Sequence, residues 1–179
     1  EIIREYELKY PRLIRTIYQK TNIWSKGERP REHVFPIVKG KYLALCEGDD
    51  YWTCPHKLKV QVMALEDSDC DIAFHPVMSR VYRNENFYKT YGYYGEKEKV
   101  IPFDDIFLKG GTAIPAVSVL VRYDIISQAN KDFQNFFKQR LSHFYWQVIG
   151  SMKAGAYYIP KEMAVYRRGY PGSWTNQNY

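Results

Sequence analysis

The stretch YLALCEGDDYW, residues 42–52, decides the fold. Its first five residues are apolar or small, and three carboxylates and two aromatic residues follow within the next six positions. A short, continuous apolar run predicts a strand buried on both faces. In open α/β sheets, the polar residues that follow such a strand lie in the crevice where ligands bind. We therefore expect an α/β domain with a ligand site at residues 47–50.

The carboxylates of Glu47, Asp49 and Asp50 are close enough in sequence to repel one another. Burying them together requires a positive partner, and hard oxygen ligands select Mg²⁺ or Mn²⁺, which proteins commonly share with substrate phosphates. A solvated acidic turn is the alternative interpretation. Zinc is less favoured: three cysteines and two histidines fall between residues 46 and 75, but none forms a Cys-x-x-Cys pair.

Strand and helix patterns alternate along the chain and predict a mixed sheet flanked by helices. We expect helices at 1–9, 32–39 (or a turn), 55–65, 103–108 and 144–154, and strands at 13–18, 42–46, 71–74, 116–121, 157–159 and 163–166. Leu58, Val62 and Leu65 would form one face of the helix over 55–65. Residues 80–100 predict a hairpin or long loop over the site. Its Tyr88, Tyr91, Tyr93 and Tyr94 would either stack on sugars or cover the hairpin surface.

Length, charge and composition limit the class of protein. The chain has 179 residues, which predicts a single domain over 1–179, and a formal net charge of +6. Residues 42–71 nevertheless carry seven acidic and two basic side chains. A run of five or more basic residues is absent, which argues against nucleic acid as a partner. No apolar stretch reaches membrane-spanning length, and three cysteines favour a reducing compartment. These features predict a cytoplasmic protein, with the inner face of the membrane as an alternative location.

The segment KGKYLALCEGDDYWTCPHKLKVQVMAL, Lys39–Leu65, resembles the centre of family 2 glycosyltransferases of the GT-A fold. The likeness continues upstream in EYELKYP and LIRTIYQ, and downstream in AVSVLVR and in GAYYIPKEMAVYRRGYPGSW. It implies a GT-A-like, Rossmann-like mixed sheet. Members of that family begin with a nucleotide-binding strand and loop upstream of the position of Glu1. The resemblance therefore predicts an N-terminally truncated, partial glycosyltransferase domain.

The resemblance also implies roles for individual residues. Glu47 and Asp49 match the acidic positions of the metal motif, with Asp49 as the direct ligand, and Asp50 and Trp52 would shape the donor pocket. Arg167 and Arg168 match a basic stretch near the donor phosphates. The expected activity is inverting, metal-dependent transfer of a sugar from a nucleotide diphosphate sugar to a hydroxyl of a glycan or lipid-linked acceptor. Synthesis of a bacterial surface glycan is the expected setting.

Three positions depart from the family pattern. His143 stands where the family has a carboxylate base, and it would act either as the base or only as a helix cap. Gly169 replaces a histidine, and Cys54 replaces an aspartate. These departures leave open an alternative function, a catalytically degenerate domain that binds a glycan or a protein without turnover. The oligomeric state is not predicted.

Overall fold

The computed structural model describes residues 2–23, 26, 28, 30–132 and 143–171, and divides the chain into two compact units, Glu1–Lys39 and Gly40–Tyr179. In the described part of the first unit, the elements are α1 (Ile2–Lys9), α2 (Pro30–Val34) and a 3₁₀ turn, η2 (Phe35–Ile37). The helices expected at 1–9 and 32–39 are thus confirmed, the second as a shorter helix followed by the turn.

The strand expected at 13–18 is wrong, because these residues are irregular. The backbone N–H groups of Leu13 and Ile14 both donate to the carbonyl of Tyr10, at 3.0 and 2.9 Å. A strand needs a neighbouring strand to satisfy its backbone groups. The described residues of this unit contain no strand, so the β-branched and aromatic composition alone does not produce one.

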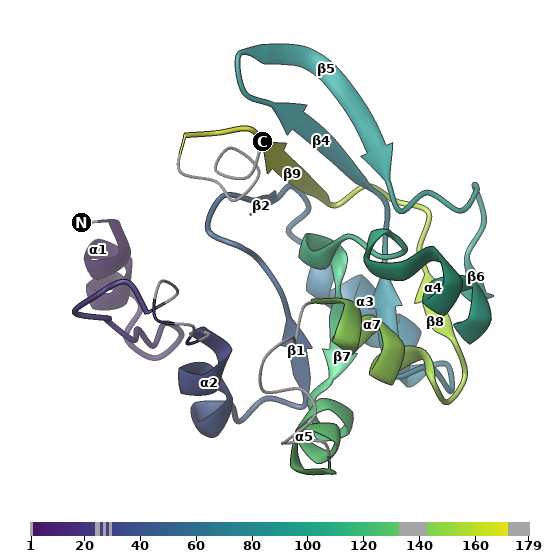
Figure 1. Cartoon of the computed structure of the whole chain (residues 1–179), viewed down its shortest axis with the longest axis horizontal. Helices are drawn as coiled ribbons and strands as arrows, with labels where there is room; N and C mark the ends of the chain where they lie inside the picture. The colour runs from purple at the N-terminus through teal and green to yellow at the C-terminus, as the bar shows by residue number, and fades with distance from the viewer. Residues whose placement is uncertain (1, 24–25, 27, 29, 133–142, 172–179) are drawn as a thin grey trace. The chain divides into compact units, whose positions relative to one another are not determined.

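The second unit is built on a five-stranded sheet with the order β1-β7-β3-β8-β6 (Figure 1). Its strands are β1 (Tyr42–Ala44), β3 (Ile72–Phe74), β6 (Lys99–Ile101), β7 (Leu120–Arg122) and β8 (Ala156–Tyr158). β3 and β8 pair in parallel and the other pairs are antiparallel, which confirms a mixed sheet. β3 is fully buried, as expected. β1 is shorter than predicted and only half-buried, because it forms an edge of this sheet rather than its centre.

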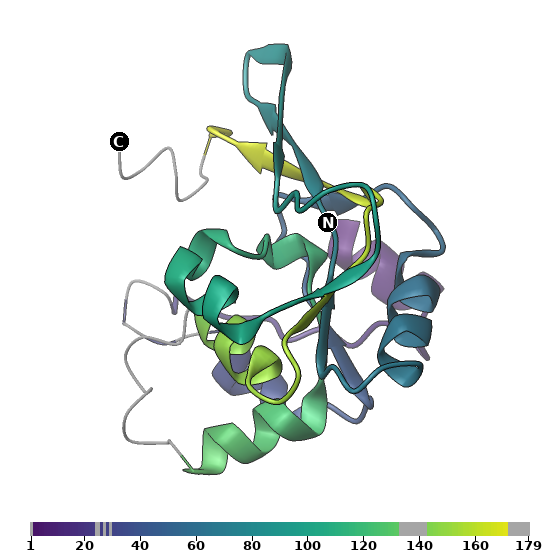
Figure 2. The ribbon, with the colours of Figure 1, turned by 90° about the vertical axis from the view of Figure 1, so that its right-hand side faces the viewer.

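Helices cover both faces of this sheet (Figures 1 and 2). α3 (Lys57–Glu66) packs on one face, and α4 (Phe103–Lys109) and α7 (His143–Ser151) lie on the other. α5 (Tyr123–Asp132) follows β7 directly. α7 ends at Ser151, earlier than the expected Ala154; Gly155 follows the three turn residues 152–154 with a φ of +80°, and its N–H donates to the carbonyl of Ser151 at 2.8 Å.

The buried face of α3 agrees with the expected one only in part: Leu65 is buried and Val62 packs against the core, but Leu58 does not belong to this face. Lys57, Gln61 and Leu65 face the core, whereas Leu58 is 41% exposed. Residues 57, 61 and 65 are spaced by four positions and therefore share a helix face. The apolar pattern was misleading because two polar side chains of this face find partners inside the protein.

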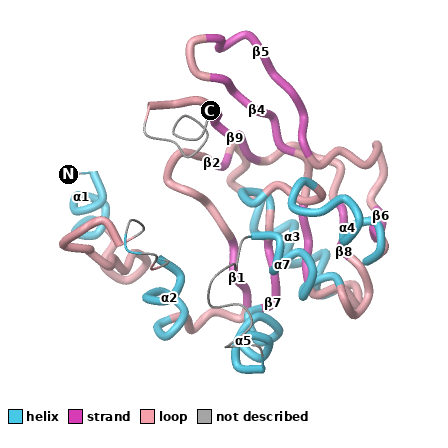
Figure 3. The backbone as a smooth tube through the Cα atoms, viewed as in Figure 1, coloured by secondary structure: helices cyan, strands magenta, loops and turns pink. Residues whose placement is uncertain are grey.

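A second, four-stranded sheet has the order β2-β9-β4-β5 (Figure 3). It consists of β2 (Tyr51–Trp52), β4 (Val77–Val81), β5 (Asn84–Tyr91) and β9 (Ala164–Arg168). β4 and β5 form the predicted hairpin, and β9 pairs with β4 in parallel and with β2 antiparallel. This pairing brings β2, which follows the acidic residues immediately, alongside the C-terminal strand.

The strand expected at 116–121 is correct only in its second half. Residues 116–118 form a 3₁₀ turn, η4, and the strand β7 begins at Leu120. Pro115 precedes the turn, and its carbonyl accepts hydrogen bonds from both the backbone N–H and the hydroxyl of Ser118, at 3.0 and 2.7 Å. This local bonding satisfies backbone groups that a strand would have left for a neighbour. Another turn, η3 (Gly110–Thr112), connects α4 to this region.

Candidate functional site

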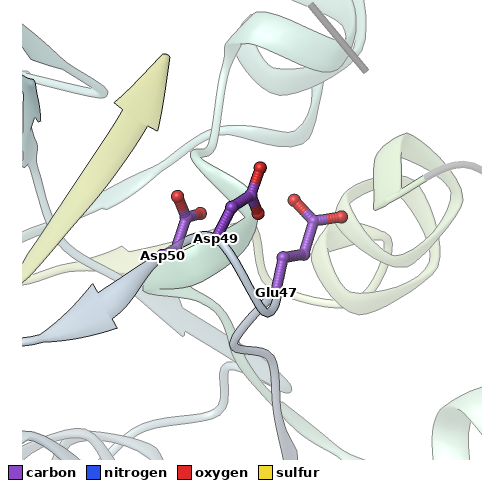
Figure 4. A group of neighbouring side chains, drawn as sticks. All are labelled: Glu47, Asp49 and Asp50. Atoms are coloured by element: carbon purple, nitrogen blue, oxygen red, sulfur yellow. The ribbon is translucent and has the colours of Figure 1, made fainter. Parts of the chain in front are cut away.

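The three predicted carboxylates lie together in the turn between β1 and β2. The N–H of Asp50 donates to the carbonyl of Glu47 at 3.0 Å, which closes the turn. One ligating oxygen from each of Glu47, Asp49 and Asp50 lies within 4.8 Å of the others. All three carboxylates project from the same side of the turn (Figure 4). Within the part of the chain that the structure describes, this is the group of three or more acidic, histidine or cysteine side chains that could hold a metal ion.

Asp50 is the most buried of the three and is incompletely satisfied. Its side chain is only 8% exposed, and Oδ2 has no hydrogen-bond partner among the described residues. Burial raises the pKa of Asp50 to about 7, and the charges of Asp49 and Glu47 act in the same direction. A buried carboxylate oxygen without a partner is costly. The arrangement therefore fits a cation, which would neutralise the repulsion and occupy the free oxygen.

Arg167 fastens the acidic turn to β9. Its backbone N–H donates to Asp50 Oδ1 at 2.9 Å, and its Nε donates to the carbonyl oxygen of Asp49. Its guanidinium carbon also lies 4.9 Å from the centre of the Tyr170 ring. Through the two hydrogen bonds, Arg167 stabilises the conformation of the acidic turn.

A pocket of about 250 Å³ opens beside the acidic turn. It is lined by Glu47, Asp50, Tyr91, Gly111, Thr112, Ile114, Pro115, Ala116, Val117, His143, Tyr166 and Arg168. The structure thus brings together four residues selected from the sequence: Glu47, Asp50, His143 and Arg168. Asp49, Trp52 and Arg167 are not among the lining residues that the structure describes, and they adjoin the pocket through the turn and the strands behind it.

His143 is the first residue of α7 and is exposed at the pocket wall. Its Nε2 lies 3.3 Å from the carbonyl oxygen of Gly111. A carbonyl can only accept, so in this contact Nε2 carries the proton. In the neutral imidazole, Nδ1 is then the nitrogen that can take up a proton. The arrangement is compatible with a base and also with a capping contact.

Arg168 and two tyrosines form the part of the pocket wall that comes from the second sheet. Arg168 Nη1 lies 2.6 Å from the hydroxyl of Tyr91, and the rings of Tyr91 and Tyr166 meet edge to face at 6.1 Å between centres. A guanidinium carries five donors in a planar fork, so one bond to Tyr91 leaves others for an anion. This wall combines a cationic group with aromatic faces.

Another wall, Ile114–Val117, is held by side chains of two helices and of strand β2. Gln147 of α7 accepts from the N–H of Ile114 at 3.3 Å and donates to its carbonyl at 2.7 Å. Trp52 Nε1 donates to the carbonyl of Val117 at 3.3 Å, and Gln61 Nε2 donates to that of Ser118 at 2.7 Å. Trp52 therefore contributes to the pocket from behind this wall.

The tyrosines of the 80–100 segment separate into different environments. Tyr91 lines the pocket, whereas the Tyr94 ring packs against Phe74 and Tyr158 in the core, at 5.5 and 5.7 Å between centres. Tyr93 is half exposed and donates to Glu96. The side chain of Tyr88 lies outside the described residues. Besides His143, two positions depart from the family pattern: Cys54 is half-buried, and Gly169 has a φ of +68°, a conformation that favours glycine.

The sequence analysis did not identify the pocket residues Gly111 and Thr112, the Ile114–Val117 wall, or Tyr166. Pro115 and the consecutive glycines at 110 and 111 were the available signal, because they interrupt regular structure directly before a buried strand. Tyr166 carried no comparable signal, since its position in a short strand does not distinguish a core ring from a pocket ring.

No helix in the described part of the chain is long and apolar enough to cross a bilayer. The sequence matches no family model. Three uncharacterized proteins, two from strains of Mycobacterium tuberculosis and one from Mycobacterium bovis, are 47% identical to it over 77 residues. The match covers 42% of this chain and 22% of each relative, so the chain spans only a small part of these relatives' length.

Solved structures of S. aureus TarS resemble the fold over nearly the whole chain. TarS in complex with UDP-GlcNAc superposes with a TM-score of 0.66 at 14% identity, covering 100% of this chain and 49% of the TarS chain. TarS in complex with UDP gives a TM-score of 0.61 at 11% identity, over 93% of this chain and 48% of that one. At this identity the likeness bears on the fold alone. The chain has a glycosyltransferase-like α/β fold of the GT-A type, and spans about half of the TarS chain that it matches.

Proposed function

We propose that this chain is the metal-dependent part of a glycosyltransferase, which moves a sugar from a nucleotide diphosphate sugar to an acceptor hydroxyl. The observation that carries the proposal is the buried, partnerless Oδ2 of Asp50 inside a cluster of three carboxylates, at a pocket of a glycosyltransferase-like fold. The resemblance of Lys39–Leu65 to family 2 enzymes supports the same function. TarS, with the similar fold, is known in complex with UDP-GlcNAc.

Glu47, Asp49 and Asp50 would hold the divalent cation, Mg²⁺ or Mn²⁺. Asp50 lines the pocket and offers a buried oxygen without a hydrogen-bond partner among the described residues, while Glu47 and Asp49 are more accessible. When bound, such an ion neutralises charge on the diphosphate leaving group. The proposal extends the sequence-based assignment, in which Asp49 and Glu47 alone were the ligands, to include Asp50.

The remaining pocket residues would bind and orient the two substrates. Arg168, in the strand to which the acidic turn is bonded, would donate to diphosphate oxygens, and Tyr91 and Tyr166 would present aromatic surface to a sugar ring. Nδ1 of His143 would accept the proton of the attacking acceptor hydroxyl, and inversion at the anomeric carbon would follow from direct displacement. A glycan or lipid-linked acceptor in bacterial surface glycan synthesis, at the cytoplasmic side of the membrane, belongs to the same proposal.

A thermal-shift panel tests this function. Nucleoside diphosphates and their sugars are added to the chain with and without Mn²⁺, using wild type, Asp50→Asn and the control Asp69→Asn. Asp69 is an exposed acidic residue outside the cluster. We expect a Mn²⁺-dependent rise in melting temperature with one nucleotide, retained in Asp69→Asn and lost in Asp50→Asn, since only ligands of the native state stabilise it.

A shift that survives Asp50→Asn would contradict the metal assignment. Binding without turnover of any sugar donor in the full-length protein would favour the catalytically degenerate alternative. The position of His143, engaged with a backbone carbonyl, is the observation on which that alternative rests.

A further inference from the structure

A buried lysine lies behind the pocket and has no part in the proposed chemistry. Lys57 is the first residue of α3 and is only 1% exposed. Burial lowers the pKa of its ammonium group to about 8, which shows that the surroundings disfavour the charge. A buried ammonium ion persists only where its contacts compensate for the lost water. Its contacts therefore indicate what it does.

Lys57 contacts the side chains of Gln61, in the same helix, and of Trp52, in β2. Its Nζ donates to Gln61 Oε1 at 2.8 Å and lies 4.5 Å from the centre of the Trp52 ring. The first contact is a hydrogen bond from a charged donor, and the second is a cation–π interaction. Lys57 thereby fixes the positions of both Trp52 and Gln61.

Both of these side chains donate hydrogen bonds to carbonyls at the C-terminal end of the Ile114–Val117 wall or directly after it. Trp52 donates to the carbonyl of Val117 at 3.3 Å, and Gln61 donates to the carbonyl of Ser118 at 2.7 Å. The second hydrogen of the Gln61 amide goes to the carbonyl of Ala73 in β3, at 3.1 Å. Trp52 also lies two residues beyond Asp50, in the strand that leaves the acidic turn. One ammonium group thus connects the acidic turn, the 3₁₀ turn of that wall and the central sheet.

We propose that Lys57 is a positioning residue of the pocket, which sets the spacing between the acidic turn and the Ile114–Val117 wall through Trp52 and Gln61. The predicted effect of Lys57 on Mn²⁺–UDP affinity rests on the proposed function. Its predicted effect on the position of the Ile114–Val117 wall does not. Residues that orient a metal site from behind typically change affinity 10- to 100-fold when altered. Lys57 occupies such a position although it lies outside the set of lining residues.

The test compares Lys57→Met with Lys59→Met in the full chain. Met keeps an unbranched, largely apolar side chain and removes the ammonium group with its charge and its hydrogen-bond donor, and Lys59 is an exposed lysine of the same helix. Two measurements are made on each variant: the Mn²⁺ dissociation constant with and without UDP, from the EPR signal of free Mn²⁺, and the ¹³C-methyl NMR spectrum of the isoleucines. Ile114 lies on the wall and is assigned with Ile114→Val; buried Ile126 of α5 is the internal reference.

We expect Lys57→Met to weaken Mn²⁺–UDP binding ~10- to 100-fold and to shift the Ile114 methyl signal, with Ile126 unchanged. Lys59→Met should leave both signals and the affinity as in wild type. A lysine that only fills space would leave Ile114 where it is. An unshifted Ile114 signal in folded Lys57→Met overturns the proposal, and so does wild-type affinity.

Two further outcomes remain decisive. If wild type binds neither Mn²⁺ nor UDP, the proposed function fails, and the Ile114 signal alone decides the role of Lys57. If Lys57→Met does not fold, Trp52→Phe replaces it, because Phe keeps a ring over the ammonium group but removes the donor to Val117. The same shift of Ile114 is then expected, and its absence overturns the proposal.

Discussion

The buried histidine that directly follows β3, His75, should make a contribution to stability that is lost in acid. Its side chain is fully buried, and Nδ1 lies 2.8 Å from the carbonyl of Pro76. The carbonyl accepts only, so Nδ1 carries the proton and Nε2 does not. Nε2 has no hydrogen-bond partner within the described part of the chain. Burial, together with the charge of Lys57, lowers the pKa of His75 to about 3.

The pH range and size of the effect follow from this pKa. Because the folded-state pKa lies below the ordinary histidine value of 6.5, the unfolded chain binds the extra proton first as the pH falls. The contribution of His75 is complete above pH ~6.5 and is lost as the pH falls toward ~3, by at most ~1.4 kcal/mol per pH unit. Between pH 7.5 and pH 5, the expected loss is about 2 kcal/mol.

Urea denaturation at pH 7.5 and pH 5 measures this loss for wild type, His75→Gln and His56→Gln. Glutamine does not titrate and keeps a donor for the Pro76 carbonyl, and His56 is a solvent-exposed histidine. On going from pH 7.5 to pH 5, the loss of unfolding free energy should be about 2 kcal/mol less in His75→Gln than in wild type, and the same as wild type in His56→Gln; the raised pKa of Asp50 acts in the opposite direction but is common to all three proteins. Equal pH dependence in wild type and His75→Gln would refute the assignment of a buried, neutral imidazole.

Four further substitutions test the packing. Gly150→Ala should lower the unfolding free energy by about 1–3 kcal/mol in urea titrations, despite the better helix propensity of alanine, because its Cβ would lie 2.8 Å from that of Ile72; a more stable variant would contradict this contact. Gly155→Ala should cost at least as much, since φ is +80° and a backbone oxygen would lie 2.4 Å away, and it should lower the melting temperature measurably. Leu65→Ala in the core should cost about 2–5 kcal/mol and Leu58→Ala under ~1, and equal losses would contradict the observed face of α3.

The acidic turn could be predicted from sequence because its signal is local. Apolar residues followed by Glu47, Asp49 and Asp50 occupy consecutive positions, and their proximity in space needs only a single turn. The structure confirms that the three carboxylates lie together. It also confirms a glycosyltransferase-like fold of the GT-A type, to which the Lys39–Leu65 resemblance had pointed. The identity of the metal ligands and the roles of His143 and Arg168 stay predictions.

Features that depend on distant partners could not be predicted. The strand expected at 13–18 had the right composition, yet the hydrogen bonds to Tyr10 produce a turn there. Gln61 and Lys57 were not assigned to the core face of α3, but Gln61 donates to two backbone carbonyls, of Ala73 and Ser118, that are remote in sequence. Periodicity records which residues are apolar, and it carries no information about acceptors inside the fold.

The hydrogen bond between Arg167 and Asp50 joins residues that lie 117 positions apart. During synthesis, the acidic turn therefore emerges long before the strand that holds it, and the three carboxylates acquire their final arrangement only after β9 has been made. Because this contact joins residues far apart in sequence, we expect the site to form late in folding. An ion bound there would link the opening of this turn to the detachment of β9, so that ion binding would oppose the unfolding of both segments together.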